Sequence, residues 1–159
     1  MKARFLVVKT GLLLWLFACL VHCKQKTPEI NGFGPYQLGK TKSSEAGRCR
    51  PDGEYNYCFL NASSSLAGHK TVTDLYFLGL GENDPLVEIL VTVNMCKEDV
   101  VANNLVSRLG QPTETHSGVL VWKQTSANVV LQKNVKGGTC EMNILALSEE
   151  KRLKQLTKL

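Results

Sequence analysis

The stretch that decides the fold covers residues 86–109 and reads LVEILVTVNMCKEDVVANNLVSRL. In its first part, the β-branched residues Ile89, Val91 and Val93 occupy every second position. Side chains of a β-strand point alternately to its two faces, so this period of two is typical of a strand with one buried face. The pattern predicts a strand over residues 86–94.

The same stretch changes its period after residue 94 and predicts a helix over residues 98–109. Val101, Leu105 and Leu109 recur every four residues, which places them on one face of a helix. Two acidic residues stand in the first turn, where they interact favourably with the helix dipole, and Gly-Gln-Pro after the last turn is a stop signal.

Further strand-like runs lie on both sides of this stretch. They cover Tyr55–Asn61 and Thr71–Leu80 before it, and Val119–Gln124, Val129–Asn134 and Cys140–Leu147 after it. Each is rich in β-branched, apolar or aromatic residues and is bounded by turn residues. The order of the elements predicts an α+β domain over residues 51–148. We expect a hairpin, one helix and a three-stranded meander, which form a small antiparallel sheet with the helix on one face.

The charge of the 159-residue chain is distributed unevenly. Its 19 Lys and Arg exceed its 14 Asp and Glu, so the formal net charge is +5. Residues 51–148, however, contain six bases and ten acids and carry a net charge of −4. The expected folded body is therefore acidic, and we expect no binding to nucleic acid. The length fits one domain and excludes a large two-domain enzyme.

Residues 1–22 are predicted to be a signal peptide. A basic start precedes an uninterrupted apolar run over residues 11–21, GLLLWLFACLV. A membrane-spanning helix needs about 20 apolar residues. The shorter run found here is typical of an export signal.

The segment Leu20-Val21-His22-Cys23 ends this apolar run and resembles the lipobox of bacterial lipoproteins. In that family the cysteine receives a diacylglyceryl group and becomes the mature N-terminus. The resemblance therefore implies lipidation at Cys23 and attachment to a membrane. The family has a small residue before the cysteine, and His22 departs from that pattern. Cys19 is a competing acceptor, but cleavage there would leave an odd number of thiols.

Ordinary secretion is the alternative to lipidation. Val21 and Cys23 are small enough for cleavage after Cys23 by a eukaryotic-type signal peptidase. Asn61-Ala62-Ser63 would then be an acceptor for N-glycosylation.

Two segments flank the predicted body. Residues 23–50 are rich in Gly, Pro, Ser and Lys, and they are predicted to be the lipidated N-terminus and a flexible linker. One short ordered piece is expected at Tyr36–Leu38. Residues 149–159 contain three Leu among four basic residues and are predicted to be a solvated C-terminal tail, with a short amphipathic helix as the alternative.

Cleavage before Cys23 leaves an even set of four further cysteines, which are Cys49, Cys58, Cys96 and Cys140. Exported chains of this size use such a set for disulfides, and the sequence allows three pairings. We favour Cys49 with Cys58 as a local link. We favour Cys96 with Cys140 as a link between the start of the helix and the last strand.

No metal or cofactor is expected. The chain lacks a Cys-x-x-Cys pair, and neither His69 nor His116 stands at ligand spacing from a cysteine. Residues 34–41, GPYQLGKT, fit the phosphate-loop pattern G-x-x-x-x-G-K-[ST]. That pattern binds phosphate between a strand and a helix. We reject the match because no apolar strand precedes these residues and no helical period follows them.

The overall pattern is similar to that of small bacterial exported lipoproteins. It favours a non-enzymatic protein that a lipid anchor holds at the periplasmic or outer face of a bacterial membrane, and that binds a protein partner, for example as an inhibitor. Two alternatives remain. One is a secreted eukaryotic effector with a glycan on Asn61, and the other is a small extracytoplasmic hydrolase that uses His69 or His116 with a carboxylate such as Asp74.

Overall fold

The computed structural model describes residues 28–133 and 137–158, without the side chains of residues 61–63. The predicted signal peptide and the candidate lipid acceptors Cys19 and Cys23 lie outside the described residues. In chain order, the described elements are β1 (Gly32–Phe33), β2 (Tyr36–Gln37), the 3-10 helix η1 (Ser43–Glu45), β3 (Cys49–Asp52), β4 (Tyr55–Leu66), β5 (His69–Leu78), β6 (Leu86–Val93), α2 (Glu98–Leu109), β7 (Glu114–His116), β8 (Val119–Lys123), β9 (Asn128–Gln132), β10 (Cys140–Leu145) and α3 (Glu150–Leu156).

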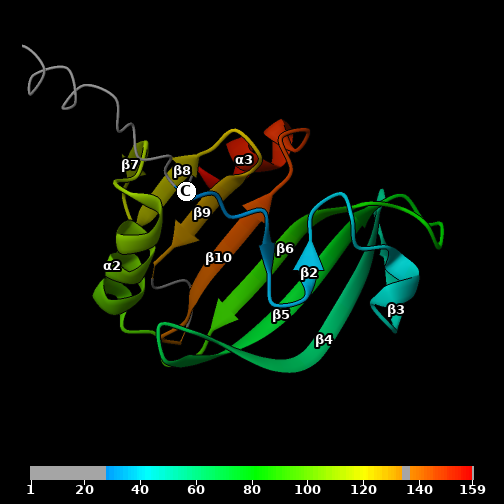
Figure 1. The fold of residues 1–159 in the computed structure, drawn as a ribbon, viewed down its shortest axis with the longest axis horizontal. Coiled ribbons are helices and arrows are strands. Elements are labelled where there is room, and N and C mark those ends of the chain that lie inside the picture. The colour runs from blue at the N-terminus through cyan, green and yellow to red at the C-terminus, as the bar shows by residue number, and fades with distance from the viewer. Residues whose placement is uncertain (1–27, 134–136, 159) are drawn as a thin grey trace, which may run out of the picture.

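Eight strands of the described chain form one antiparallel sheet in the order β3-β4-β5-β6-β10-β9-β8-β7 (Figure 1). The predicted hairpin is β5–β6 and the predicted meander is β8–β9–β10, and both are confirmed. The prediction of a small sheet is wrong in its extent. Hairpin and meander join because β6 pairs with β10, with Val91 opposite Met142.

Short strands at both edges extend the sheet beyond the predicted elements. β3 contains a proline and β7 has only three residues, so neither shows a clear alternation of apolar and polar residues. β4 continues to Leu66 instead of ending at Asn61, with an irregularity in its pairing to β5 between Leu60 and Ser64. The second half of β4 is rich in polar residues, so it lacks the apolar alternation that predicts a strand.

Helix α2 covers one face of the sheet and has the predicted bounds. Its buried residues are Val101, Ala102, Leu105 and Leu109. They belong to a core with Leu75, Phe77, Ile89, Val91, Trp122, Leu131, Met142 and Ile144. The indole N–H of Trp122 donates to the carbonyl of Gly110 at 2.9 Å, so β8 also holds the C-terminal end of α2. The α+β class and the helix on one face of the sheet are confirmed.

Residues 28–50 differ from the flexible linker that the sequence predicted. Ile30, Phe33, Tyr36 and Leu38 pack against the core on the side of α2, and Ala46 is buried in it. The β1–β2 turn brings these scattered apolar residues to one side. Polar and glycine residues between them form the turn, so the apolar residues show no regular period in the sequence. The expected linker is corrected for this segment, which is part of the domain.

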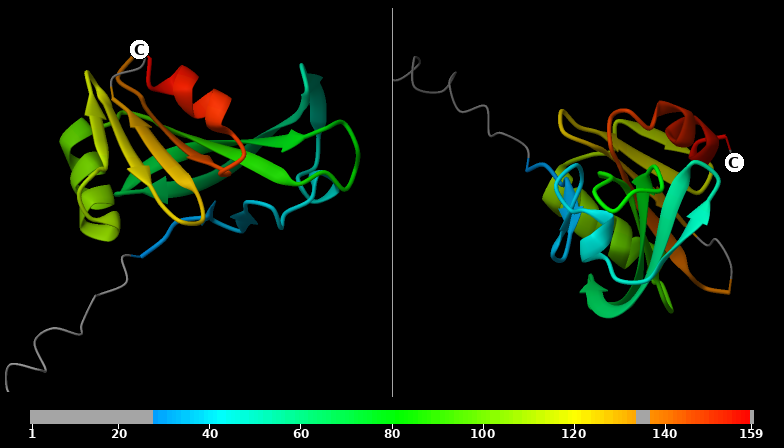
Figure 2. Two further views of the ribbon diagram at one scale, coloured as in Figure 1. Left: turned by 90° about the horizontal axis from the view of Figure 1, so that it is seen from above. Right: turned by 90° about the vertical axis from the view of Figure 1, so that its right-hand side faces the viewer.

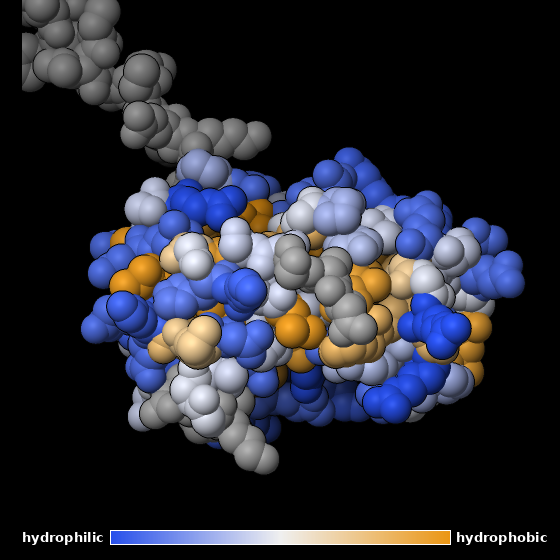
Figure 3. Space-filling model, turned by 90° about the horizontal axis from the view of Figure 1, so that it is seen from below, coloured by the Kyte–Doolittle hydropathy of each residue, from blue (hydrophilic) through white to orange (hydrophobic). Residues whose placement is uncertain are grey.

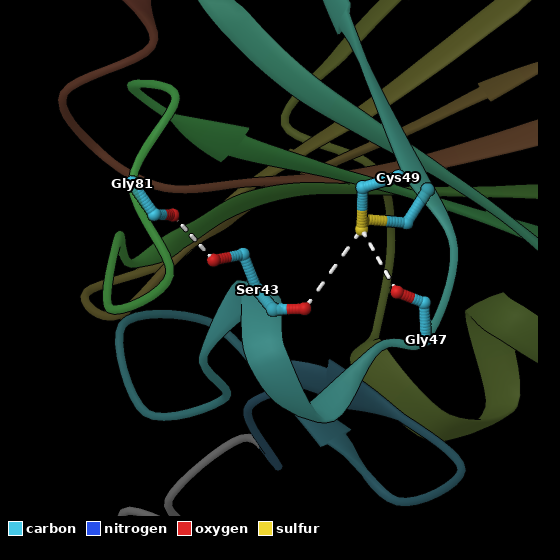
Figure 4. Close-up of a disulfide and its surroundings, with 5 residues drawn as sticks. Ser43, Gly47, Cys49 and Gly81 are labelled. Carbon is cyan, nitrogen blue, oxygen red and sulfur yellow. Dashed lines mark hydrogen bonds between the residues drawn. A yellow bond between two sulfur atoms is a disulfide. The ribbon is translucent and has the colours of Figure 1, made fainter.

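The N-terminal segment is attached at both of its ends. At its start, the N–H of Ile30 donates to Oε1 of Gln124 at 2.9 Å, and Nε2 of Gln124 donates to the carbonyl of Pro28 at 3.1 Å. Toward its end, Oγ of Ser43 donates to the carbonyl of Gly81 at 2.6 Å (Figure 4). The segment therefore runs from the β8–β9 turn to the β5–β6 turn (Figure 1).

Both favoured disulfides are present among the described residues. Cys49–Cys58 joins β3 to β4 at directly paired positions. Sγ of Cys49 also lies 3.8 Å from the carbonyl oxygen of Ser43, so this disulfide sits against η1 (Figure 4). Cys96–Cys140 joins the residue two positions before α2 to the first residue of β10.

The C-terminal segment is also part of the fold and not a solvated tail. Helix α3 packs on the face opposite α2 (Figure 2). Its Leu156 is buried and Leu153 packs with it against Val119, Val121, Val130 and Leu145. The predicted tail is corrected from Glu149 to Lys158, because Leu153 and Leu156 form the apolar side of this short helix.

We predict that the two disulfides stabilise the fold unequally. In the chain-entropy model a link across about 10 residues contributes about 3 kcal/mol and a link across about 45 residues contributes about 4 kcal/mol. The variant Cys96→Ala/Cys140→Ala is therefore expected to lose more free energy of unfolding than Cys49→Ala/Cys58→Ala. Urea denaturation followed by tryptophan fluorescence measures both losses. A larger loss for the Cys49/Cys58 variant would contradict the expected order.

Candidate functional site

The candidate site is the part of the sheet that α3 leaves uncovered. Helix α3 packs over β8, β9 and β10, so the same face remains open over β3 and β4. There Arg50 pairs with Tyr57 across the two strands. Arg48, Arg50, Tyr57 and Phe59 line a pocket of about 410 Å³ next to Cys49. These four lining residues are named the arginine–aromatic patch.

Ring contacts position the side chains of the patch. Cζ of Arg50 lies 5.1 Å from the centre of the Tyr57 ring, which is a cation–π contact. The Tyr57 and Tyr76 rings have centres 5.1 Å apart. Phe59 is 49 % exposed, and neither Arg48 nor Arg50 has an ion-pair partner in the described chain. The patch thus combines two unpaired positive charges with open aromatic surface.

Asp74 supports the patch from the neighbouring strand. The hydroxyl of Tyr57 donates to Oδ1 of Asp74 at 3.0 Å, and Asp74 stands opposite Phe59 in the register of β4 and β5. Burial raises the pKa of the Asp74 carboxyl, and the bond from Tyr57 lowers it in part. Burial and the same bond raise the pKa of the Tyr57 hydroxyl. Tyr57 therefore remains a hydrogen-bond donor at neutral pH.

A partly buried ion pair lies where α3 meets the open part of the sheet. Arg152 donates to Glu88 from Nε at 3.1 Å and from Nη2 at 3.3 Å, and the Glu88 side chain is buried. The hydroxyl of Tyr55 donates to Oε2 of Glu149 at 2.7 Å. These bonds hold α3 against the sheet beside a pocket of about 320 Å³. Burial, together with the charge of Glu88, raises the pKa of Tyr76 to about 12.

The structure does not bring the two candidate histidines to Asp74. His69 begins β5, and its side chain lies on the opposite face of that strand from Asp74, about 17 Å away along it. His116 lies in β7, which four strands separate from β5, or about 24 Å at the usual strand spacing. Its Nε2 lies 3.6 Å from Oε2 of Glu114. The hydrolase alternative therefore finds no assembled pair in these three residues.

The stretch that fits the phosphate-loop pattern forms part of the N-terminal segment. Gly34 has a φ of +59° and makes the turn between β1 and β2. Thr41 is buried, and its Oγ1 accepts a hydrogen bond from the N–H of Gln37 at 2.9 Å. The three-residue η1 follows, so this stretch lacks the helix N-terminus that presents N–H groups to a phosphate.

Within residues 28–133 and 137–158, no group of three or more His, Cys, Asp or Glu side chains is placed to hold a metal ion. In that part of the chain, no helix combines the length and the apolar character needed to cross a membrane. The Asn61 side chain, which the glycosylation alternative requires, lies outside the described side chains.

The spacing of two cysteines is a sequence signal for the patch. The local patterns alone place Arg48 and Arg50 in a linker, and Tyr57 and Phe59 in a short strand. A link between Cys49 and Cys58 favours pairing of the segments around these cysteines. With these two cysteines opposite each other, antiparallel register places Arg50 beside Tyr57 and Arg48 near Phe59.

Comparison with known proteins does not assign the site. The sequence matches no protein-family model and no curated protein, and no solved structure matches the chain.

We predict that Glu88 makes the fold less stable as the pH rises. Burial raises the pKa of its carboxyl in the folded chain above the ordinary value, although Arg152 opposes part of the shift. The folded state therefore binds this proton more tightly than the unfolded state. The free energy of unfolding falls as the pH rises from the ordinary value of 4.5 through the raised one.

The variant Glu88→Gln removes this titration and keeps an oxygen that accepts from Arg152. Its stability relative to the wild type is expected to increase from pH 4 to pH 7, as measured by urea denaturation at each pH. The exposed Glu54→Gln serves as the control, with no such trend expected. A constant difference between Glu88→Gln and the wild type across this range would contradict the prediction.

Proposed function

We propose that this protein is a non-enzymatic, exported lipoprotein that binds an acidic protein partner at a bacterial membrane surface. Acyl chains on Cys23 would anchor it, and the arginine–aromatic patch would be its binding surface. The observation that carries the proposal is the patch itself, where two unpaired arginines lie beside the exposed ring of Phe59. The proposed activity needs no cofactor.

The disulfides support export. Disulfides form and persist in oxidising compartments outside the cytoplasm and are rare inside it. Cys49–Cys58 and Cys96–Cys140 both have fully or partly buried cysteines and link separate elements of the fold. An extracytoplasmic environment therefore fits the folded chain, and the predicted export signal gives a route to it.

The attachment of the N-terminal segment supports an anchor close to the membrane. Only four residues, 24–27, separate Cys23 from Pro28. Pro28 is already bonded to Gln124 of the β8–β9 turn. The five residue steps from Cys23 to Pro28 span at most about 18 Å, so a lipid on Cys23 would hold this turn near the headgroups. Lys24 and Lys26 would each add about 1 kcal/mol of attraction to an anionic surface.

The composition of the patch supports protein binding. Tyrosine, phenylalanine and arginine are enriched at the centres of protein interfaces, because they combine large contact area with directed polar contacts. The patch lies at the β3 end of the molecule, and the chain enters the fold at the β8–β9 turn toward the other end (Figures 1 and 2). On an anchored protein, the patch would face away from the membrane.

The rigidity of the patch supports an inhibitor-type role. The Cys49–Cys58 disulfide fixes β3 on β4, and the Tyr57 ring is held by Arg50 on one side and by Asp74 at its hydroxyl. A surface that is ordered before binding loses less entropy when a partner docks. Unpaired arginines favour a partner that presents carboxylates, since Arg binds them in a bidentate way.

We predict that Cys23 determines membrane attachment. The wild type, expressed in a bacterium, is expected in the membrane fraction with a mature N-terminus that carries the mass of attached acyl chains. The variant Cys23→Ala is expected to lose this modification and leave the membrane fraction, because the basic residues 24 and 26 alone bind weakly.

Cys19→Ala is the matched control and is expected to stay attached. Fractionation and mass spectrometry of the intact protein measure both properties. An unmodified N-terminus at Lys24 in the wild type would end the lipoprotein proposal. A glycan on Asn61 in a eukaryotic host, together with that N-terminus, would establish ordinary secretion.

We predict that a protein contacts the patch at Phe59. Replacement of Phe59 by the photoreactive p-benzoylphenylalanine is expected to give a cross-linked adduct on irradiation of intact cells of the source organism. The same replacement at Val100, a 45 % exposed residue of α2, is the control and is expected to give none. The adduct should be lost when Arg48→Glu and Arg50→Glu are added, because both charges would then repel an acidic partner. An adduct that persists with both reversals would contradict the assigned surface.

A further inference from the structure

The outer edge of β4 is open beyond the point where β3 ends its pairing. β3 pairs with β4 only from Tyr55 to Cys58, whereas β4 continues to Leu66. No other described strand pairs with this side of β4, and Gly34 of the β1–β2 turn lies near the Ser64 side chain (Figures 1 and 2). Backbone N–H and C=O groups at such an edge can pair with another extended chain.

The open edge carries few of the usual protections against pairing. Natural edge strands are typically short, carry lysine, proline or other charged residues, or contain a β-bulge. β4 has 12 residues, YNYCFLNASSSL, with no charged residue and no proline. Its one irregularity is the register shift between Leu60 and Ser64. Figure 3, seen from below, shows hydrophobic residues exposed between hydrophilic ones on this side of the molecule.

The arginine–aromatic patch lies where the open edge begins. The disulfide pair Cys49 and Cys58 is the last paired position of β3 and β4. The next residue of β4 is Phe59, and Arg48 lies just before β3. A chain that continued the row of β3 along β4 would therefore pass beside the ring of Phe59 and the guanidinium of Arg48.

We infer that an extended, acidic segment of the partner adds to the sheet as a new strand along β4 from Phe59 to Leu66. The backbone of this segment would pair with the open edge, and its carboxylates would meet Arg48 and Arg50. This inference rests on the proposed protein-binding function and adds the mode of binding. Strand addition gives affinity through main-chain hydrogen bonds, and side chains on alternate positions give specificity.

The combination of edge and charge favours a peptide over the two other occupants. A nucleic acid would satisfy the arginines but has no peptide backbone to pair with β4. A second copy of this chain would present its own β4, which contains no carboxylate for Arg48 and Arg50. An acidic peptide in extended form satisfies both features together.

The test uses a fluorescein-labelled octapeptide in which Glu alternates with Val or Thr, and measures its binding to the full mature protein by fluorescence anisotropy. We expect saturable binding that falls at least about tenfold in the variant Arg48→Glu/Arg50→Glu. The matched control Arg108→Glu, an exposed arginine on α2, is expected to leave binding unchanged. A peptide with Lys in place of Glu is expected not to bind.

Two further peptides test strand pairing itself, because alternate amides of a strand point to opposite sides. One carries N-methyl groups on the odd-numbered amides and the other on the even-numbered amides. With the glutamates toward the arginines and the peptide in one strand direction, only one set of amides faces β4. One methylated peptide should lose binding and the other should retain it. Equal binding of both would overturn strand addition.

The outcomes separate this inference from the proposed function. If the Phe59 cross-link forms and depends on the arginines, but both methylated peptides bind equally, the protein-binding function stands and strand addition fails. Tighter binding of a single-stranded oligonucleotide than of the Glu peptide would overturn both. A dimer in sedimentation that the Glu peptide cannot dissociate would assign the edge to a second copy and overturn the inference.

Discussion

The pairing of β6 with β10 is the constraint on which the rest of the structure depends. It joins the N-terminal half of the sheet to the C-terminal meander across about 50 residues of chain, from Val93 opposite Cys140 to Glu88 opposite Leu145. The Cys96–Cys140 disulfide fixes one end of this pairing. Because the two halves form one sheet, α2 packs against a single continuous apolar face. Helix α3 packs against the opposite face, over the meander.

The same register decides what lies on the open face. A shift of one residue in a strand moves every side chain to the other side of the sheet. With the observed register, Tyr57, Tyr76 and Glu88 lie in one row across β4, β5 and β6, while the neighbouring row brings Phe59 beside Asp74. The patch and the partly buried pair of Glu88 with Arg152 are therefore products of one alignment. The core on the other face of the sheet stabilises this alignment.

Local patterns in the sequence predicted the elements and missed their long-range arrangement. The period of α2 and the alternation in β6 each involve residues close together in the sequence, so the sequence predicts both elements. Pairing of β6 with β10 is a contact between distant segments and leaves no local pattern. The N-terminal segment is predicted as a flexible linker for another reason. Its apolar side chains, such as Phe33 and Tyr36, are separated by a turn, and a hairpin of two-residue strands has no measurable period. At the site, the sequence suggests histidines as partners of Asp74, but the structure pairs Asp74 with Tyr57, a contact across two strands that leaves no local pattern.

The ordered N-terminal segment changes how an anchored protein would behave. A flexible linker up to residue 50 would let the domain turn freely and present any surface. Because the segment is bonded from Pro28 at the β8–β9 turn to Ser43 at the β5–β6 turn, it spans the fold instead of leaving it. The proposed anchor at Cys23 would then be joined to one end of the ordered domain by only four residues. The anchored domain would therefore adopt few orientations relative to the membrane. This restriction raises the effective concentration of the patch for a partner on the side that the patch faces, without any additional contact.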